Sequence, residues 1–232
     1  MGLFRFKGFH LDDGQAGMKI GTDAILLGGF IEFDPEDKCL DIGLGSGVIS
    51  AILAHRGIHE MHGIEMDDSA FELAKSNLEN LPHPTQFKLY HNSLQNFQAP
   101  EKFTLLVSNP PFFTKVYRPG SSPRDLARQS QHLSLNDLFL FALKHLSSSG
   151  SLQFIYPYSD LNLIHEIAGV HGFSLSKVIK IIPRKGKDAN RVILKAERGI
   201  QRLEQKEFCL RNEDLSYTTA FKDKVKSFMP FL

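Results

Sequence analysis

Apolar and polar positions along this chain follow a rhythm of short strands and longer helices between residues 38 and 182. Short continuous apolar runs predict five strands, at residues 39–42, 61–65, 87–90, 105–108 and 152–156. Between these runs, apolar residues at helical spacing follow two good capping residues, Asp67 and Ser134. Strands that alternate with helices are typical of βα units, which build a mostly parallel sheet with helices on both faces.

The pattern changes after Tyr158. One more helix, from about Leu161 to His171, leads to apolar runs at residues 178–182 and 192–196, with a polar loop of about nine residues between them. A loop of that length without a helix joins antiparallel strands. We therefore expect an antiparallel pair at the sheet edge and about seven strands in total.

The two ends of the chain fall outside this rhythm. Residues 1–33 and 201–232 show no regular alternation of strand and helix. We therefore predict a single domain, residues 1–232, with an α/β Rossmann-like core at 34–200 and an extension at each end. The first extension is expected to contribute to the functional site.

Composition narrows the class of protein. Hydrophobic residues make up 42% and charged residues 23% of the 232 residues, and the formal net charge is +1, which excludes a disordered chain and a histone-like basic protein. No apolar run reaches the roughly 20 residues that a membrane span needs, and the first residues lack the pattern of a secretion signal, so we expect a cytoplasmic protein that does not enter a membrane. The two cysteines, Cys39 and Cys209, are far apart and indicate neither a disulfide scaffold nor a zinc site. No metal is expected.

A glycine-rich segment follows the first predicted strand and opens a helix. It contains Asp41 and then Gly43, Gly45 and Gly47. Glycines let the backbone approach a ligand closely, and free amides at a helix N-terminus favour a negative or carbonyl group. The third glycine is misplaced for an NAD loop. Glu65, 18 residues after Gly47, ends the next strand, where a carboxylate can bind both hydroxyls of a ribose.

The order strand, acid, glycines, helix, strand, acid resembles the S-adenosylmethionine site of the Rossmann-like class I methyltransferases. The resemblance implies S-adenosylmethionine as cofactor and S-adenosylhomocysteine as product. Relatives commonly carry an acid after the third strand that contacts the cofactor adenine. Here Asn92 and Ser93 stand in that place, and an amide or a hydroxyl can still bond the adenine amine. An ordinary tight turn between a strand and a helix also contains glycines and remains an alternative.

The fourth strand runs into Asn109, Pro110, Pro111 and Phe112, at the same edge of the sheet. Two prolines fix the backbone and remove two amide donors, so neighbouring carbonyls can point outward as rigid acceptors. Together with the Asn109 amide they can grip both hydrogens of a planar NH2 group, while Phe112 stacks on the attached ring. A grip of this kind orients the nitrogen lone pair toward an electrophile. A proline-stiffened turn is the structural alternative.

This segment resembles the Asn-Pro-Pro-aromatic motif of methyltransferases that act on exocyclic amines of adenine or guanine, or on a glutamine amide. With residues 4–9 and 18–28 and the terminal segment 214–228, the chain resembles the bacterial tRNA1(Val) adenine-37 N6-methyltransferases. The resemblance implies adenine N6 methylation of tRNA, with Asn109 also at the cofactor. Gly21, Thr22 and Asp23 form a polar corner that could close over the cofactor, with Thr22 as N-cap of a helix at 24–30.

Other functions stay open at this point. Tyrosine is usual at the position of Phe112, and phenylalanine also occurs there in enzymes that methylate guanine N2 of rRNA. Methylation of a protein glutamine would use the same fold. A noncatalytic module that binds RNA or a nucleotide is an alternative from another class.

Two basic segments are candidates for RNA contact. Residues 115–128 have a local charge of +3 and residues 177–198 a local charge of +6. Phosphate contacts position a nucleic acid without reading its sequence, and RNA enzymes reach a base by extruding it. The residues predicted to bind tRNA are Lys115, Arg118, Arg124, Arg128, Arg184, Lys185, Lys187 and Arg191. Charge that only keeps the surface soluble is the alternative. We expect a monomer.

Overall fold

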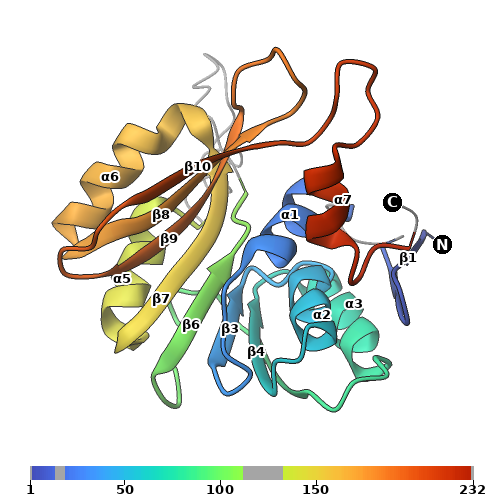
Figure 1. Ribbon diagram of the computed structural model, residues 1–232. Helices are drawn as coiled ribbons and strands as arrows, with labels where there is room; N and C mark the ends of the chain where they lie inside the picture. Colours follow the sequence, from blue (N-terminus) through green and yellow to red (C-terminus); the bar gives the residue numbers. More distant parts are fainter. Residues whose placement is uncertain (1, 14–18, 112–132, 231–232) are drawn as a thin grey trace, which may run out of the picture.

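The computed structural model describes residues 2–13, 19–111 and 133–230 (Figure 1). Its strands are β1 (Leu3–Arg5), β2 (His10–Asp12), β3 (Lys38–Ile42), β4 (Glu60–Glu65), β5 (Gln86–His91), β6 (Phe103–Ser108), β7 (Leu146–Pro157), β8 (Phe173–Ile182), β9 (Arg191–Arg198) and β10 (Glu204–Cys209). Its helices are α1 (Thr22–Phe30), α2 (Val48–His55), α3 (Asp68–Glu79), α5 (Leu135–His145), α6 (Leu161–Val170), α7 (Thr219–Val225) and a short 3-10 turn, Tyr158–Asp160. Among these helices, none has the length and apolar character needed to cross a membrane.

The main sheet has eight strands in the order β10-β8-β9-β7-β6-β3-β4-β5. Strand β9 runs antiparallel to both of its neighbours, and every other neighbouring pair is parallel. The predicted α/β fold, with a mostly parallel sheet and an antiparallel pair, is confirmed. The sheet has one strand more than the sequence predicts, because β10 in the C-terminal extension pairs with β8. Four of the six residues of β10 are Glu, Gln or Lys, so no apolar run marks it.

Helices cover both faces of the sheet, as predicted (Figure 1). On one face α1, α2, α3 and α7 bury a core that includes Leu27, Ile52 and Val225. On the other face α5 and α6 bury a second core around Phe139 and Phe154. Buried side chains of neighbouring strand positions alternate between the two cores, because successive side chains of a strand point to opposite faces.

The capping residues identified in the sequence begin two of these helices. The Asp67 carboxylate accepts a hydrogen bond from the amide of Ala70 at 2.9 Å, and Ser134 forms a capping box with Asp137. The expected cap of α1 is wrong. Thr22 is its first helical residue, and the N-cap is Gly21, which provides no side-chain bond. The Gly21 carbonyl instead accepts the amide of Ile25.

Both terminal extensions are tied to the core. The hairpin β1–β2 is held by Asn77 of α3, whose side chain accepts from the Asp12 amide at 2.8 Å and donates to the Asp12 carbonyl at 2.9 Å. The Lys7 amide donates to the Phe228 carbonyl at 2.8 Å, just beyond α7. The hairpin β1–β2 and helix α7 therefore lie on the same side of the molecule as α1 (Figure 1).

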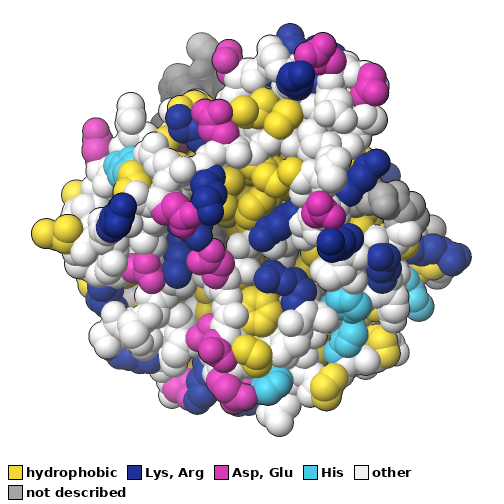
Figure 2. Space-filling view, in the orientation of Figure 1, with side chains coloured by type: hydrophobic (Ala, Val, Ile, Leu, Met, Phe, Trp, Pro, Cys, Tyr) yellow, Lys and Arg dark blue, Asp and Glu magenta, His cyan; other side chains and the backbone are white. Residues whose placement is uncertain are grey.

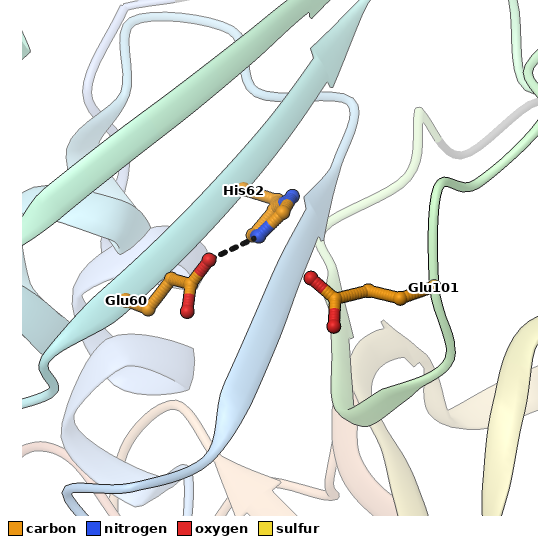
Figure 3. A group of neighbouring side chains, drawn as sticks. All are labelled: Glu60, His62 and Glu101. Carbon is orange, nitrogen blue, oxygen red and sulfur yellow. Dashed lines mark hydrogen bonds and ion pairs between the residues drawn. The ribbon is translucent and has the colours of Figure 1, made fainter.

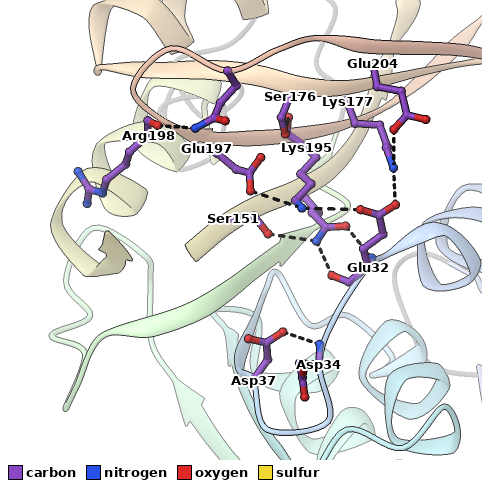
Figure 4. Close-up of polar contacts among 12 residues, drawn as sticks. Glu32, Asp34, Asp37, Ser151, Ser176, Lys177, Lys195, Glu197, Arg198 and Glu204 are labelled. Atoms are coloured by element: carbon purple, nitrogen blue, oxygen red, sulfur yellow. Dashed lines mark hydrogen bonds and ion pairs between the residues drawn. The ribbon is translucent and has the colours of Figure 1, made fainter. Parts of the chain in front are cut away.

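An ion-pair network joins the segment after α1 to the strands β8, β9 and β10 (Figure 4). The Glu32 carboxylate pairs with Lys177 and lies 3.7 Å from the Lys195 ammonium. Lys177 also lies 2.8 Å from Glu204 on β10. Hydrogen bonds from Lys177 and Lys206 lower the pKa of Glu204 to about 2. The network holds the extra strand β10 against its neighbour.

Candidate functional site

The loops of the candidate site meet at one edge of the sheet. Strands β6, β3, β4 and β5 are neighbours and run parallel, so their carboxyl ends lie side by side. The glycine-rich turn follows β3, Glu65 ends β4, Asn92 follows β5 and Asn109 follows β6. The register pairs Ile42 with Ser108. Gly43 and Asn109 therefore begin adjacent loops on neighbouring strands, which lie about 4.8 Å apart.

The glycine-rich turn has a left-handed backbone at Gly43, Gly45 and Gly47, with φ of 77°, 57° and 78°. Residues with a side chain rarely adopt such backbone angles, which explains why glycine occupies these three positions. At Gly47 a Cβ atom would also lie 3.1 Å from Leu78, so α2 begins in close contact with α3. At Gly43 a Cβ atom would meet nothing within 4 Å, so the turn is open on its outer side.

Asp41 is buried completely at the end of β3. One carboxylate oxygen, Oδ2, accepts a hydrogen bond from the Ser50 hydroxyl at 2.8 Å. The other oxygen, Oδ1, is buried and has no partner among the described residues. Burial raises the pKa of Asp41 to about 7, the nearby charge of Glu65 adds to the rise, and the Ser50 bonds oppose it. A buried acceptor without a donor fits a ligand that brings a positive charge or an N–H group.

The Glu65 carboxylate links the glycine-rich turn to the start of α3. Its Oε2 accepts from the Gly45 amide at 2.9 Å, and its Oε1 accepts from the amides of Met66 and Asp67 at 2.8 and 2.9 Å. A carboxylate has about four lone-pair sites, so these three bonds leave roughly one for a hydroxyl of a ligand. The expected grip on both ribose hydroxyls stays a prediction, and in this arrangement one hydroxyl is the easier partner.

A small hollow lies beside this turn, between the ends of β3, β4 and β5. Three predicted residues, Gly43, Glu65 and Asn92, line it. Ser93 is not part of the lining, and its carbonyl caps the turn that follows by accepting the amides of Asn96 and Phe97. Six other lining residues were not predicted as site residues, namely Ile42, Ile64, Met66, Leu94, Gln95 and Leu133. Of these residues, only Met66 has a signal in the sequence that could have indicated a site, because it is an apolar residue directly after an acid at the end of a strand.

The segment after β6 is described as far as Pro111. Asn109 and Pro111 are partly buried and Pro110 is buried. The Ser108 hydroxyl donates to the Ile42 carbonyl at 2.8 Å, which fixes the end of β6 against the end of β3. Phe112 and four predicted RNA-binding residues lie outside the described residues, namely Lys115, Arg118, Arg124 and Arg128.

The polar corner before α1 does not join the hollow. Thr22 and Asp23 line a second, larger cleft of about 440 Å³ with Arg184, Lys187 and Arg191. The Arg191 Nε donates to Asp23 Oδ2 at 2.8 Å. The cleft thus brings residues that were predicted to bind the cofactor together with residues that were predicted to bind RNA. Neither Gly21 nor Lys185 lines this cleft, and Lys185 lies 3.5 Å from Glu213 instead.

A possible metal-binding group lies at the opposite edge of the sheet. Ligand atoms of Glu60, His62 and Glu101 lie within 4.8 Å of one another at the amino ends of the strands (Figure 3). The two carboxylates are already paired with lysines, Glu60 with Lys88 and Glu101 with Lys38. Burial lowers the pKa of His62, with Glu60 opposing. The group is remote from the glycine-rich turn, and the expectation that no metal takes part stays a prediction.

Comparisons with known proteins agree with this geometry. The family model of the methyltransferase small domain matches residues 15–162. The tRNA1(Val) (adenine(37)-N6)-methyltransferase of Actinobacillus pleuropneumoniae serotype 7 is 32% identical over 97% of this chain and 96% of its own length. Among solved structures, a protein from Agrobacterium tumefaciens described as a predicted O-methyltransferase superposes with a TM-score of 0.68 at 20% identity, covering 89% of this chain and 96% of its own.

A further solved structure, of lower similarity, contains a bound product. This SAM-dependent methyltransferase of Thiobacillus denitrificans was crystallised with S-adenosyl-L-homocysteine. It superposes with a TM-score of 0.52 at 15% identity and covers 71% of this chain and 69% of its own. The fold is therefore one that other proteins use to hold this ligand.

Proposed function

The chain belongs to the methyltransferase small domain family, and we propose that it transfers the methyl group of S-adenosylmethionine to the exocyclic N6 amine of an adenine in tRNA. Adenosine 37 of tRNA1(Val) is the expected target, because curated relatives that match nearly the whole chain carry that name. Fold, cofactor class and enzyme class follow from the family. The position in the tRNA and the residues that act there are part of the proposal.

One observation carries the proposal: the register places the glycine-rich turn beside the segment that begins with Asn109. Ile42 and Ser108 are opposite each other in the parallel pair β3–β6, and their two loops leave the sheet together. An enzyme that joins a methyl donor to an acceptor amine must hold both within reach of each other. A donor held by the turn after β3 and an acceptor held by the segment after β6 would satisfy that requirement.

The residues present fit S-adenosylmethionine. The unpartnered Oδ1 of Asp41 suits a cationic group, the open outer side of Gly43 allows close approach of a ligand, and Glu65 retains capacity for a hydroxyl. Asn92 lines the hollow and would meet the adenine part, with Ser93 a weaker candidate. When bound, S-adenosylmethionine supplies an electrophilic methyl group on a sulfonium, and S-adenosylhomocysteine is the product.

In this proposal Asn109 orients the acceptor amine. Its side-chain oxygen and the carbonyl beside Pro110 accept the two amine hydrogens, and Phe112 stacks on the base. Orientation of this kind leaves the nitrogen lone pair directed at the methyl group. No strong base is needed, since methylation makes the amine acidic and its proton can leave to water or an acceptor. The tRNA would be held by the basic residues of the β8–β9 loop. A monomer in the cytoplasm, without a metal, stays our expectation.

Substitution of Asn109 tests the proposal. Asn109→Ala should reduce methyl transfer to tRNA by at least a hundredfold and leave the affinity for S-adenosylmethionine within about threefold, because the grip acts on the acceptor. Asn162→Ala on the exposed face of α6 is the matched control. Radiolabelled transfer to tRNA from cells that lack the enzyme measures the first quantity, and calorimetry the second. Unchanged transfer in Asn109→Ala would refute the grip.

Nucleoside mass spectrometry separates the remaining alternatives. Loss of N6-methyladenosine from the tRNA of deletion cells supports the proposal. Loss of N2-methylguanosine from rRNA, or of a methylated glutamine from a protein, would assign the same fold to another acceptor. If the intact protein transfers no methyl group to any RNA or protein, it is a binding module.

A further inference from the structure

The cleft at the start of α1 is built by three segments that are far apart in sequence. It lies between the first turn of α1, the loop that joins β8 to β9, and the turn from Arg211 to Tyr217 after β10. Strands β8 and β10 run parallel to β6, so the cleft opens at the same sheet edge as Asn109. Two to four strand spacings of about 4.8 Å separate them, which places the cleft roughly 10–20 Å from the proposed acceptor site.

The cleft carries a strong positive charge. Arg184, Lys187, Arg191 and Arg211 line it, with Asp23 as the single acidic lining residue. Asp23 pairs with Arg191. Among the described residues, no carboxylate lies within 4.0 Å of the cationic groups of Arg184, Lys187 or Arg211. Three positive charges therefore face the cleft without a carboxylate partner, an arrangement that suits phosphate.

Arg211 differs from the other cations because an aromatic ring and a backbone carbonyl fix the position of its guanidinium. The rings of Phe221 and Tyr217 stack with centroids 4.5 Å apart, and the Arg211 guanidinium lies 3.9 Å above the Tyr217 ring. Arg211 also donates from Nη1 to the Leu215 carbonyl at 2.6 Å. These contacts place the guanidinium over a pair of stacked rings at the wall of the cleft. RNA-binding proteins use such fixed guanidinium planes as platforms on which an unpaired base stacks.

Leu215 adds a second observation at the same place. It is the one described non-glycine residue in the left-handed region, with φ of 69°, and the residue is 55% exposed and lines the cleft. The turn is held by bonds from the Asn212 amide to the Ser216 carbonyl and from the Ser216 amide to Asp214. An exposed leucine in a strained conformation contributes little to the core. Strain of this kind is typical of ligand-binding turns.

We infer that this cleft binds an unpaired nucleotide of the RNA substrate that lies near the methylated adenine in the chain. Its base stacks on the Arg211 guanidinium and contacts Leu215, and its phosphate lies between Arg184 and Lys187. The inference rests on the proposed function for its biological substrate, but the binding itself does not require methyl transfer. A fixed plane beside an apolar side chain favours a nucleotide over an acidic peptide, which needs only charge.

Fluorescence of a short RNA tests the stacking. The probe is a single-stranded hexanucleotide with one 2-aminopurine, whose emission falls when the base stacks. The intact protein should quench the probe. Arg211→Lys keeps the charge but removes the plane, so it should weaken binding about tenfold and abolish the quenching, with the salt dependence retained. Arg202→Lys, at the opposite end of β10, is the control. Equal affinity and quenching in Arg211→Lys would overturn the inference.

Two further variants separate the contributions. Arg184→Gln with Lys187→Gln should lower the slope of log affinity against log salt by about 0.7, because these two residues hold one phosphate and each phosphate neutralised on a single strand contributes about 0.7. Leu215→Gly accepts the backbone angle and should fold normally while weakening binding severalfold. An unchanged salt slope in the first variant would show that Arg184 and Lys187 do not contact a phosphate. Displacement of the probe by polyglutamate as effectively as by RNA would make the cleft a site for acidic peptides.

Methyl transfer distinguishes this inference from the proposed function. If the intact protein methylates tRNA and Arg211→Lys raises the KM for tRNA with little change in kcat, both stand. If the protein methylates tRNA and neither KM nor probe binding changes in Arg211→Lys, the inference fails alone. If the probe binds at Arg211 but no RNA is methylated, the proposed function fails and the nucleotide cleft stands.

Discussion

Binding of S-adenosylmethionine should become about sixteenfold tighter between pH 5.5 and pH 7.0, because Asp41 must be ionised to receive a cationic group. The pKa of this buried carboxyl is raised to about 7. With that value, about 3% of the protein carries the ionised form at pH 5.5 and about 50% at pH 7.0. The apparent affinity falls with the fraction that can bind, so the ratio of the two fractions gives the expected factor.

The same carboxyl makes stability depend on pH in the opposite direction. In the unfolded chain Asp41 ionises near its ordinary pKa of 3.8, whereas in the folded protein ionisation waits until about pH 7. The free energy of unfolding of the ligand-free protein is therefore highest below pH 3.8 as far as this group is concerned. It falls as the pH rises, by about 4 kcal/mol once the pH exceeds 7.

Asp41→Asn is the test, because it keeps an acceptor for the Ser50 hydroxyl and removes the titration. Calorimetry at pH 5.5 and 7.0 should show a flat, weaker affinity in this variant, and urea unfolding should show no contribution from this group between pH 4 and 7. A sixteenfold change that persists in Asp41→Asn, or a flat profile in the unaltered protein, would refute the reasoning.

Three further predictions concern the architecture around the site. Gly47→Ala should lower the free energy of unfolding by about 2–3 kcal/mol, because the new Cβ atom is strained and contacts Leu78. Gly172→Ala is the control, because Gly172 has a φ of 76° but nothing lies within 4 Å of the new Cβ atom, and it should cost only about 1 kcal/mol in the same urea titration. Equal losses in the two variants would show that the contact with Leu78 does not matter. Glu65→Gln should weaken S-adenosylmethionine binding about tenfold in calorimetry, because a neutral amide oxygen binds the backbone amides of the turn less strongly than a carboxylate. An unaltered affinity would show that the turn does not need the negative charge. Ser134→Ala should lower the free energy of unfolding by about 1 kcal/mol, because α5 loses its N-cap. An unchanged midpoint of thermal unfolding would contradict this prediction.

The sheet and its glycine-rich turn could be predicted because their signals are local. A buried parallel strand such as β3 is mostly apolar, with Cys39, Leu40 and Ile42 buried, and the turn after it needs glycine at positions of positive φ. Caps such as Asp67 are equally local, since the side chain bonds a residue three positions ahead. These features depend on neighbours in sequence and hardly on the rest of the fold.

The features that escaped prediction depend on distant partners. Strand β10 is polar and is held by Lys177 and by pairing with β8, neither of which its own sequence reveals. Thr22 has the right residue type for a cap, but the chain enters α1 one residue earlier. The cleft lined by Asp23 and Arg211 joins residues almost 190 positions apart. Only the folded arrangement shows that a cofactor candidate and RNA candidates meet there.

The packing of α7 and the residues after it against α1 has a consequence for the order in which the protein folds during synthesis. Helix α1 leaves the ribosome almost 200 residues before Val225 and Phe228, which pack beside its Gly29. The part of α1 around Gly29 therefore stays uncovered until those later residues have been synthesised. The long stretch of chain between these partners makes their contact slow to form. It lowers the stability of the contact only slightly, because the entropy cost of closing a loop grows with the logarithm of its length. A nascent chain halted before residue 219 should consequently bind chaperones that a chain extended through residue 230 no longer binds.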